Sequence, residues 1–156
     1  MEIDAKCTVR GVPNYWPLSP QGAKRLSPFN SYNSLNNRIM NNLFVYLELQ
    51  EDSRVAEVSL ELLTKGRSLA TQLGCRLEAV AAGCNLEGIA AQVMPYGVDV
   101  LHLFDAEGLY PYTSLPHTSV LVNLFKEEQP QIALMGATVI GRDLGPRVSS
   151  ALHSGL

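Results

Sequence analysis

The chain has 156 residues, of which 46% are hydrophobic and 17% are charged, and its formal net charge is −3 at pH 7. This composition predicts one globular domain, and no stretch approaches the ~20 apolar residues of a membrane span, so no membrane insertion is expected. Residues 1–39 hold five basic and two acidic side chains, whereas residues 40–156 hold seven basic and thirteen acidic ones. Because nucleic-acid phosphates need a basic surface, the acidic body argues against a nucleic-acid partner.

The cysteines and histidines give no sign of a disulfide framework or a metal site. The three cysteines (Cys7, Cys75 and Cys84) are odd in number and contain no CxxC pair. The pattern favours free thiols in a reducing, cytoplasmic location. The three histidines lie far apart in the sequence without ligand spacing, so no metal site is predicted.

Residues 1–39 differ in kind from the rest of the chain. They contain four of the nine prolines, a cluster of asparagines and serines, and no sustained period of 2 or 3.6. Such a segment is predicted to be disordered or loosely draped. Because Met40 stands immediately before the first apolar run, we expect residues 40–156 to form the α/β domain and residues 1–39 to be a disordered or non-native extension.

The first strand and helix follow Met40. Leu43–Leu47 is apolar throughout, which is typical of a parallel strand that is covered on both faces. Residues 58–73 then predict a helix that ends at Gly74. Its predicted inward stripe consists of Leu62, Gly66, Leu69, Ala70 and Leu73. Gly66 within this stripe indicates close packing against the sheet.

The middle of the chain repeats this pattern. Residues 76–82 predict a second strand that Gly83 closes, and residues 86–93 predict a short helix. Residues 98–104 predict a third strand. A loop over residues 105–115 follows it.

The last third predicts two more helices around a fourth strand. Pro116 opens a helix at its first turn, residues 131–136 form the strand, and residues 146–152 form the final helix, which Pro146 opens. Strand and helix therefore alternate four times. Such alternation predicts an α/β fold with a parallel sheet and helices on both faces.

No common catalytic or nucleotide-binding signature is present. The sequence has no Walker A loop, no GxGxxG after the first strand, no GxSxG elbow and no HExxH. No catalytic residue is therefore predicted, and a small hydrolase or transferase lacks any convergent pair of base and nucleophile.

The turn after the fourth strand is the strongest candidate for a site, because open α/β sheets bind ligands outside the carboxyl ends of their strands. Two interpretations are open. The backbone around Gly136 and Gly141, with Arg142 or Arg147, could meet a phosphate or a partner at a helix N-terminus. Alternatively, Asp143 only caps the final helix, and Arg142 only pairs with Asp143 or another acidic group.

Three stretches of the sequence resemble the N-terminal domain of the electron transfer flavoprotein alpha subunit. The first stretch is Gly136-Ala137-Thr138 followed by Gly141-Arg142-Asp143-Leu144-x-Pro146-Arg147-Val148. The others are residues 52–66 with the following Arg67, and Pro95-Tyr96-Gly97-Val98-Asp99. The resemblance runs in one order from Met40 to Leu156. Family members continue beyond the equivalent of Leu156 into a domain that binds FAD, so we expect this chain to be incomplete at its C-terminus.

The resemblance implies a role in electron transfer. The intact alpha subunit pairs with a beta subunit, holds FAD mainly in its C-terminal domain, and accepts electrons from flavin dehydrogenases such as those of fatty acid β-oxidation. The N-terminal domain, similar in fold to adenine nucleotide alpha hydrolases and universal stress proteins, serves mainly subunit association. This chain alone is then expected to bind no FAD and to be an electron-carrier subunit, not an enzyme. The residues of the expected interface turn near the flavin are Gly136, Thr138, Gly141, Arg142, Asp143 and Arg147.

An alternative is a separate adenine-nucleotide-binding module of the universal stress protein type. Such a module needs a Gly-rich phosphate loop that ends in Ser or Thr after the fourth strand. Here four residues separate Gly136 from Gly141, and Arg142 and Asp143 follow. The alternative is therefore less well supported by the sequence.

Overall fold

The computed structural model describes residues 6–10 and 42–156. These residues form a five-stranded, wholly parallel sheet in the order β1-β4-β3-β2-β5. The strands are β1 (Lys6–Arg10), β2 (Leu43–Leu47), β3 (Leu77–Gly83), β4 (Val100–Asp105) and β5 (Ile132–Leu134). The α-helices are α1 (Glu57–Leu73), α2 (Ile89–Val93), α3 (Ser114–Glu128) and α4 (Val139–Leu152), and two short 3₁₀ helices are η1 (Met94–Tyr96) and η2 (Glu107–Leu109). The predicted α/β fold is confirmed.

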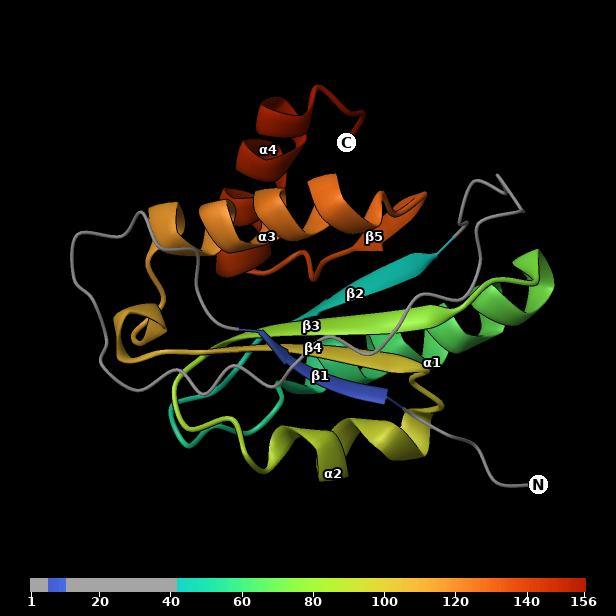
Figure 1. Cartoon of the computed structure of the whole chain (residues 1–156), viewed down its shortest axis with the longest axis horizontal. Coiled ribbons are helices and arrows are strands. Elements are labelled where there is room, and N and C mark those ends of the chain that lie inside the picture. The colour runs from blue at the N-terminus through green and yellow to red at the C-terminus, as the bar shows by residue number, and fades with distance from the viewer. Residues whose placement is uncertain (1–5, 11–41) are drawn as a thin grey trace.

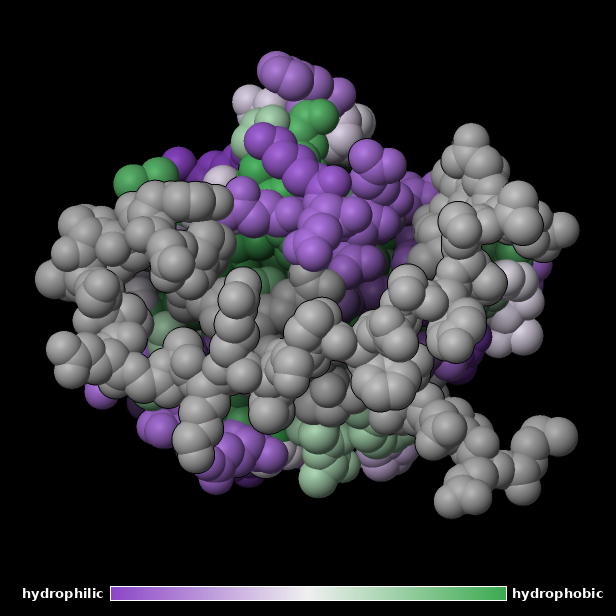
Figure 2. Space-filling view, viewed as in Figure 1, coloured by the Kyte–Doolittle hydropathy of each residue, from purple (hydrophilic) through white to green (hydrophobic). Residues whose placement is uncertain are grey.

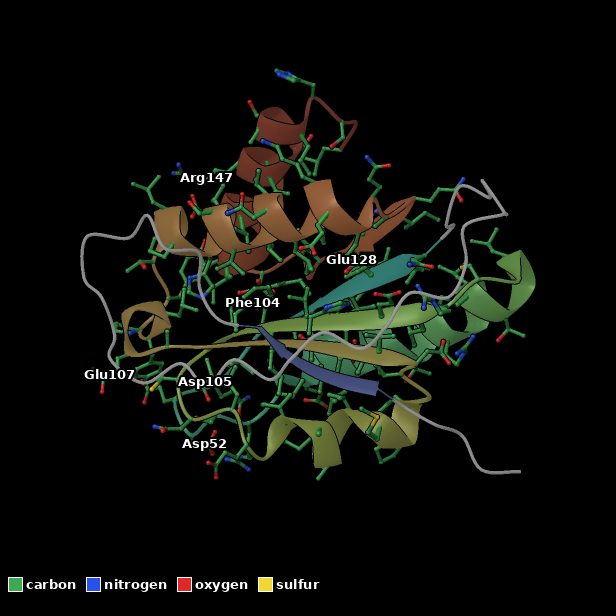
Figure 3. The ribbon with its side chains drawn as sticks, in the orientation of Figure 1. Asp52, Phe104, Asp105, Glu107, Glu128 and Arg147 are labelled. Atoms are coloured by element: carbon green, nitrogen blue, oxygen red, sulfur yellow. The ribbon has the colours of Figure 1, made fainter. Side chains whose placement is uncertain are left out.

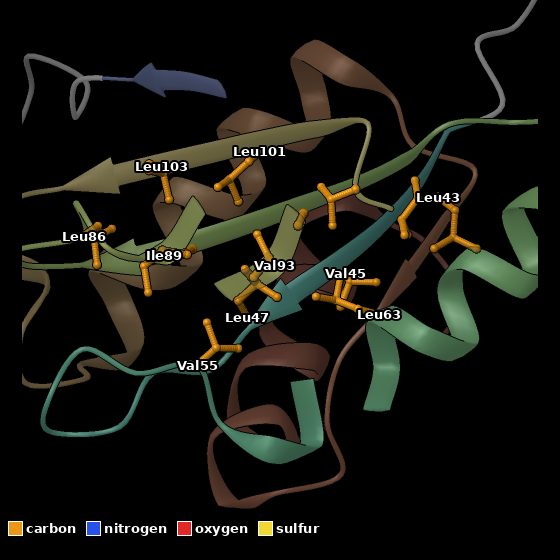
Figure 4. Close-up of a cluster of buried hydrophobic side chains, with 14 of the residues drawn as sticks. Leu43, Val45, Leu47, Val55, Leu63, Leu86, Ile89, Val93, Leu101 and Leu103 are labelled. Carbon is orange, nitrogen blue, oxygen red and sulfur yellow. The ribbon is translucent and has the colours of Figure 1, made fainter. Parts of the chain in front are cut away.

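The helices cover both faces of the sheet, with α3 and α4 on one side and α1 and α2 on the other (Figure 1). Every residue of β2 is buried. Leu43, Val45 and Leu47 pack with Leu63 of α1 and Val93 of α2 in one apolar cluster (Figure 4). The alternate side chains of β2 belong to the cluster under α3 and α4, which explains why this strand is apolar without alternation.

The outer side of α3 is polar. Figure 2 shows mainly hydrophilic residues over this helix, with apolar side chains beneath them toward the sheet. Val120, Leu121, Leu124 and Phe125 of α3 are all buried, as is His117 one turn earlier. Within the described residues, no helix has the length and apolar character to span a membrane.

The buried stripe of α1 is rotated from the prediction. Ser59, Leu63, Gly66 and Ala70 are buried, while Leu73 is 54% exposed. The error arose because the predicted stripe left out Leu63, which packs against the sheet. Gly66 lies close to the sheet as predicted: an added Cβ would stand 3.0 Å from Leu77 Cδ1 and 3.2 Å from Val45 Cγ2.

The largest error concerns α4, which begins at Val139 and not at Pro146. The predicted irregular turn over residues 137–145 is mostly helix, and Pro146 lies inside it. Thr138 starts the helix early, because its side-chain oxygen accepts a hydrogen bond from the Gly141 N–H at 3.1 Å. Gly141, Gly145 and Pro146 all lie inside α4, where packing and the cap override their low helix propensity.

Strand β1 lies within the segment that was predicted to be disordered. Lys6–Arg10 pairs in parallel with the first five residues of β4. The prediction of disorder is therefore wrong for these five residues, since a short β-prone run needs only a partner edge to form a strand. The rest of residues 1–39 and the domain boundary at residue 40 lie outside the described residues and stay predictions.

Candidate functional site

The candidate site lies at the carboxyl ends of β2 and β5. The chain passes from β2 through β3 to β4 in one direction, and β5 then pairs with the opposite side of β2. The strand order thus reverses between β2 and β5, and this is where open α/β sheets form a ligand crevice. Two segments meet there: Glu48, directly after β2, and the turn of residues 135–138 that leads into α4.

Glu48 is the central polar group of this crevice. Its side chain is buried, and both carboxylate oxygens accept from Thr138 Oγ1, at 2.7 and 2.9 Å. Its backbone N–H donates to Ser59 Oγ at 2.9 Å, which ties the end of β2 to α1. A negative charge at a helix N-terminus is stabilising, because the backbone N–H groups there carry a partial positive charge. Sequence reasoning missed Glu48; its signal was an acidic residue directly after a buried strand.

Gly136 and Gly141 allow the turn, the helix and Glu48 to come together. A Cβ on Gly136 would stand 2.7 Å from Glu48 Oε1, and a Cβ on Gly141 would stand 1.8 Å from the Gly136 carbonyl oxygen. Any larger residue at position 141 would therefore clash with backbone. These glycines make room for the protein's own backbone and carboxylate.

The predicted residues Asp143 and Arg147 belong to a different cluster. Asp143 accepts hydrogen bonds from Ser114 Oγ, from Tyr112 Oη at 2.8 Å and from Arg147 Nε at 2.8 Å. The bonds from Ser114, Arg147 and Tyr112 lower the pKa of Asp143 to about 2. Burial, followed by the bond to Asp143, raises the pKa of Tyr112 to about 12. This cluster fastens the loop before α3 to α4.

The second interpretation of this segment is thereby corrected for the Asp143 cap and for the pair between Arg142 and Asp143. Asp143 does not cap α4, because Thr138 occupies the cap position. Arg142 is exposed, and the arginine that pairs with Asp143 is Arg147, one helical turn further on. Side chains four residues apart lie on the same face of a helix, whereas neighbours do not.

The loops at this edge of the sheet are acidic. Asp52, Asp105 and Glu107 lie on the same side of the molecule, beyond the carboxyl ends of the strands (Figure 3). Asp105 accepts from the backbone N–H groups of Asn85 and Leu86, at 2.9 Å each, and so holds the turn before α2. Asp52 is paired with Arg54, whereas Asp105 and Glu107 leave acidic charge at this edge, which disfavours phosphate groups.

An open groove of about 870 Å³ lies between β5 and α4, with Met135, Arg142, Gly145 and Leu152 among its lining residues. In the described part of the chain, β5 is an edge strand of the sheet. Residues 42–156 contain no group of three or more His, Cys, Asp or Glu side chains that could hold a metal ion.

Comparison with known proteins identifies the family. Residues 43–156 match the model of the electron transfer flavoprotein domain. The chain is 38% identical over 114 residues to the electron transfer flavoprotein subunit alpha of Clostridium acetobutylicum, a match that covers 73% of this chain and 34% of that protein. It is 42% identical to protein FixB of Clostridium saccharobutylicum, with the same coverage of each chain.

A third relative is named as an electron-transfer subunit of a reductase. This acryloyl-CoA reductase electron transfer subunit beta, from Anaerotignum propionicum, is 36% identical over 126 residues, 81% of this chain and 34% of that protein. The chain spans about a third of the length of these curated relatives. The resemblance seen in the sequence is confirmed: the chain belongs to the electron transfer flavoprotein domain family, in which it matches the alpha subunit.

Proposed function

We propose that this chain is the N-terminal, subunit-associating part of an electron transfer flavoprotein alpha subunit. In the complete complex, the alpha subunit pairs with a beta subunit, accepts electrons from flavin dehydrogenases, including those of the acyl-CoA dehydrogenase type, and passes them on through FAD. This part of the chain holds no FAD by itself. The match of residues 43–156 to the family is the observation that carries the proposal.

The geometry of the carboxyl edge supports an associating role. The crevice between β2 and β5 contains the protein's own carboxylate, and the surrounding loops are acidic. FAD carries a diphosphate, which such an edge disfavours. Next to the crevice, the open groove beside β5 leaves apolar surface available for contact with another chain.

The segment from Gly136 to Arg147, which comprises the turn after β5 and the first part of α4, is proposed as part of the interface. Arg142 is exposed near the start of α4, whereas Arg147 is held by Asp143. An exposed arginine at the rim of an interface contributes through its charge and its planar hydrogen-bonding group. Arg142 is therefore the residue of this turn that is best placed to reach a partner.

The test is the association of this chain with the beta subunit from the same source, measured by isothermal titration calorimetry. Arg142→Glu should weaken binding about tenfold, in the range of a lost charge pair. Lys65→Glu is the matched control: it makes the same charge change at an exposed position on α1, which covers the opposite face. No binding by the wild-type chain would contradict the proposed role, and equal losses for the two variants would contradict the assignment of the turn.

A further inference from the structure

The two edges of the sheet differ in length. At one edge, β5 has three residues, and so short a strand offers another chain little to pair with. At the other edge, β4 has six residues, and its middle four are buried. An apolar strand of this length pairs readily with a further strand when its outer side is free. In this chain β1 takes that outer side, in parallel with β4 (Figure 1).

β1 comes from outside the region that the chain shares with its family. The family match begins at Leu43, whereas β1 is Lys6–Arg10. The matched region contains β2 to β5, and among these four strands β4 has a partner on one side only, β3. The strand that completes this edge is therefore supplied by a separate part of the sequence.

β1 also lies far along the sheet from the next strand of the chain. β3 and β4 lie between β1 and β2, and residues 11–42 connect them. Connections between neighbouring elements are usually much shorter, and the entropic cost of closing a connection grows with its length. A tether of this length presents its strand at an effective concentration in the millimolar range. A strand from another molecule then competes with β1 at a similar concentration.

Charge favours a basic strand at the edge of β4. β1 begins with Lys6 and ends with Arg10, and the register pairs Arg10 with Phe104, next to Asp105. Asp105 is exposed and accepts hydrogen bonds from backbone N–H groups. Residues 40–156 as a whole hold thirteen acidic and seven basic side chains. Opposite charges therefore steer β1 toward the domain, whichever molecule supplies it.

We infer that the outer edge of β4 is a strand-docking site, which the chain's own β1 occupies, and that β1 of a second copy of this chain takes the same place at high concentration. The exchange of an identical strand between copies costs little, because the same contacts form in both arrangements. This site lies at the opposite edge of the sheet from the groove beside β5, so the inference goes beyond the proposed contact with a beta subunit.

Cross-linking of the whole chain tests the docking site. The register places positions 6 and 100 opposite each other, so Lys6→Cys/Val100→Cys carries two thiols that meet when β1 lies on β4. All variants also carry Cys7→Ser, so that only one thiol of β1 reacts. Dibromobimane, which joins only closely spaced thiols, should link positions 6 and 100 within one chain at about 10 µM, where exchange between molecules is rare. A folded double variant that forms no such link would overturn the docking site.

The second copy is tested by mixing two single variants. Chains with Lys6→Cys and chains with Val100→Cys are combined at about 1 mM, near the effective concentration of the tethered strand. Neither chain can form the link between positions 6 and 100 alone, so this link, identified by mass spectrometry of the peptides, reports a strand of one molecule on β4 of the other.

Lys65→Cys is the matched control for Lys6→Cys in that mixture. Lys65 is exposed on α1, so its thiol meets position 100 of another molecule only by chance collision. The link between positions 6 and 100 should form at least about fivefold more often than the link between positions 65 and 100, because the competing strands have similar concentrations. Equal yields would overturn exchange between copies.

Hydrogen exchange of the wild-type chain needs no variant and keeps the inference testable if a cysteine variant does not fold. An exchanging β1 leaves its edge for part of the time, which frees the alternate amides of β4 that bond to it. These amides should exchange at least about tenfold faster than the amides of β3, which lies between β2 and β4. Equal protection of the two strands would show that β1 does not leave, against the inference.

Discussion

Glu48, directly after β2, and Glu78, in β3, are both buried carboxylates, but they contact different groups. Glu78, in β3, lies 2.8 Å from His102 Nε2 and 3.1 Å from an Arg76 nitrogen. Glu48 contacts a hydroxyl and the start of a helix. The first arrangement joins neighbouring strands inside the sheet, because the contact between Glu78 and His102 links β3 to β4.

The difference between the two regions shows that the role of a buried carboxylate depends on whether it lies within a strand or at the carboxyl edge of the sheet. Glu78 lies in the strand itself, so its partners are His102 of the neighbouring strand β4 and Arg76 just before β3, and its role is structural. Glu48 lies at the carboxyl edge, where ligands of this fold class bind, and Thr138 Oγ1 links it to the Gly141 N–H at the start of α4. The predictions below separate the two regions by their response to substitution.

Gly141→Ala should produce the largest effect. The added Cβ would stand 1.8 Å from the Gly136 carbonyl oxygen, and this clash is with backbone, which cannot turn away. We expect a loss of about 3 kcal/mol or more in the free energy of unfolding, measured by urea denaturation.

Gly145→Ala is the control for that variant in the same helix. Its Cβ would stand 3.5 Å from Leu156 Cδ1 and 3.8 Å from Met135 Sδ, which are ordinary contacts. Because alanine favours a helix over glycine, this variant should gain about 0.5–1 kcal/mol. Equal effects of the two substitutions would contradict the packing described for the turn.

Glu78→Leu should follow, with a loss of about 3 kcal/mol, because it leaves the buried His102 without its carboxylate. The double variant Glu78→Leu/His102→Leu should recover much of that loss, since an apolar pair carries no buried charge. Urea denaturation of the two single variants and the double variant measures the coupling. Strictly additive losses would mean that the two side chains do not act as a pair.

Thr138→Ala should cost about 2 kcal/mol, less than either substitution above. It removes the cap of α4 and leaves the buried Glu48 carboxylate without its hydroxyl donor. Thr138→Ser keeps the hydroxyl and should stay near the wild-type stability. If serine fails to restore what alanine loses in the same denaturation assay, the hydroxyl is not the stabilising group.

The smallest effect concerns the pH dependence of Asp143. Its pKa is about 2 in the folded chain, below the ordinary value of 3.8. Its contribution to stability is therefore fully present above pH 3.8 and is lost as the pH falls toward 2. Asp143→Asn should remove this acid-dependent part, which unfolding midpoints between pH 5 and pH 2 would detect; an unchanged pH profile would mean that the cluster with Ser114 and Arg147 is not formed in solution.

The sequence predicted the order of strands and helices because each element from Leu43 onward carries a clear periodicity or a clear stop such as Gly74. It failed at α4, where two glycines and a proline mimic a turn while contacts distant in sequence hold a helix. The hydrogen bond that matters most there joins Thr138 to Glu48, 90 residues apart. No local pattern contains such a contact, so Glu48 emerged only from the fold.

Because contacts distant in sequence cannot be predicted locally, the residues of the predicted site fall into two separate groups in the structure. Gly136, Thr138 and Gly141 come together with Glu48 at the crevice. Asp143 and Arg147, which are close to them in sequence, face the loop before α3. A helix places residues that are two positions apart on different sides, so reading the segment as a turn could not separate the two groups.

The central claim is that this chain associates with another subunit and binds no nucleotide itself. Its most direct test is native mass spectrometry of the purified wild-type chain after incubation with FAD or AMP, followed by a visible absorption scan. The account predicts the mass of the bare polypeptide and no flavin band. Retained FAD or AMP would contradict it, because the crevice that Glu48 fills would then be open to a nucleotide.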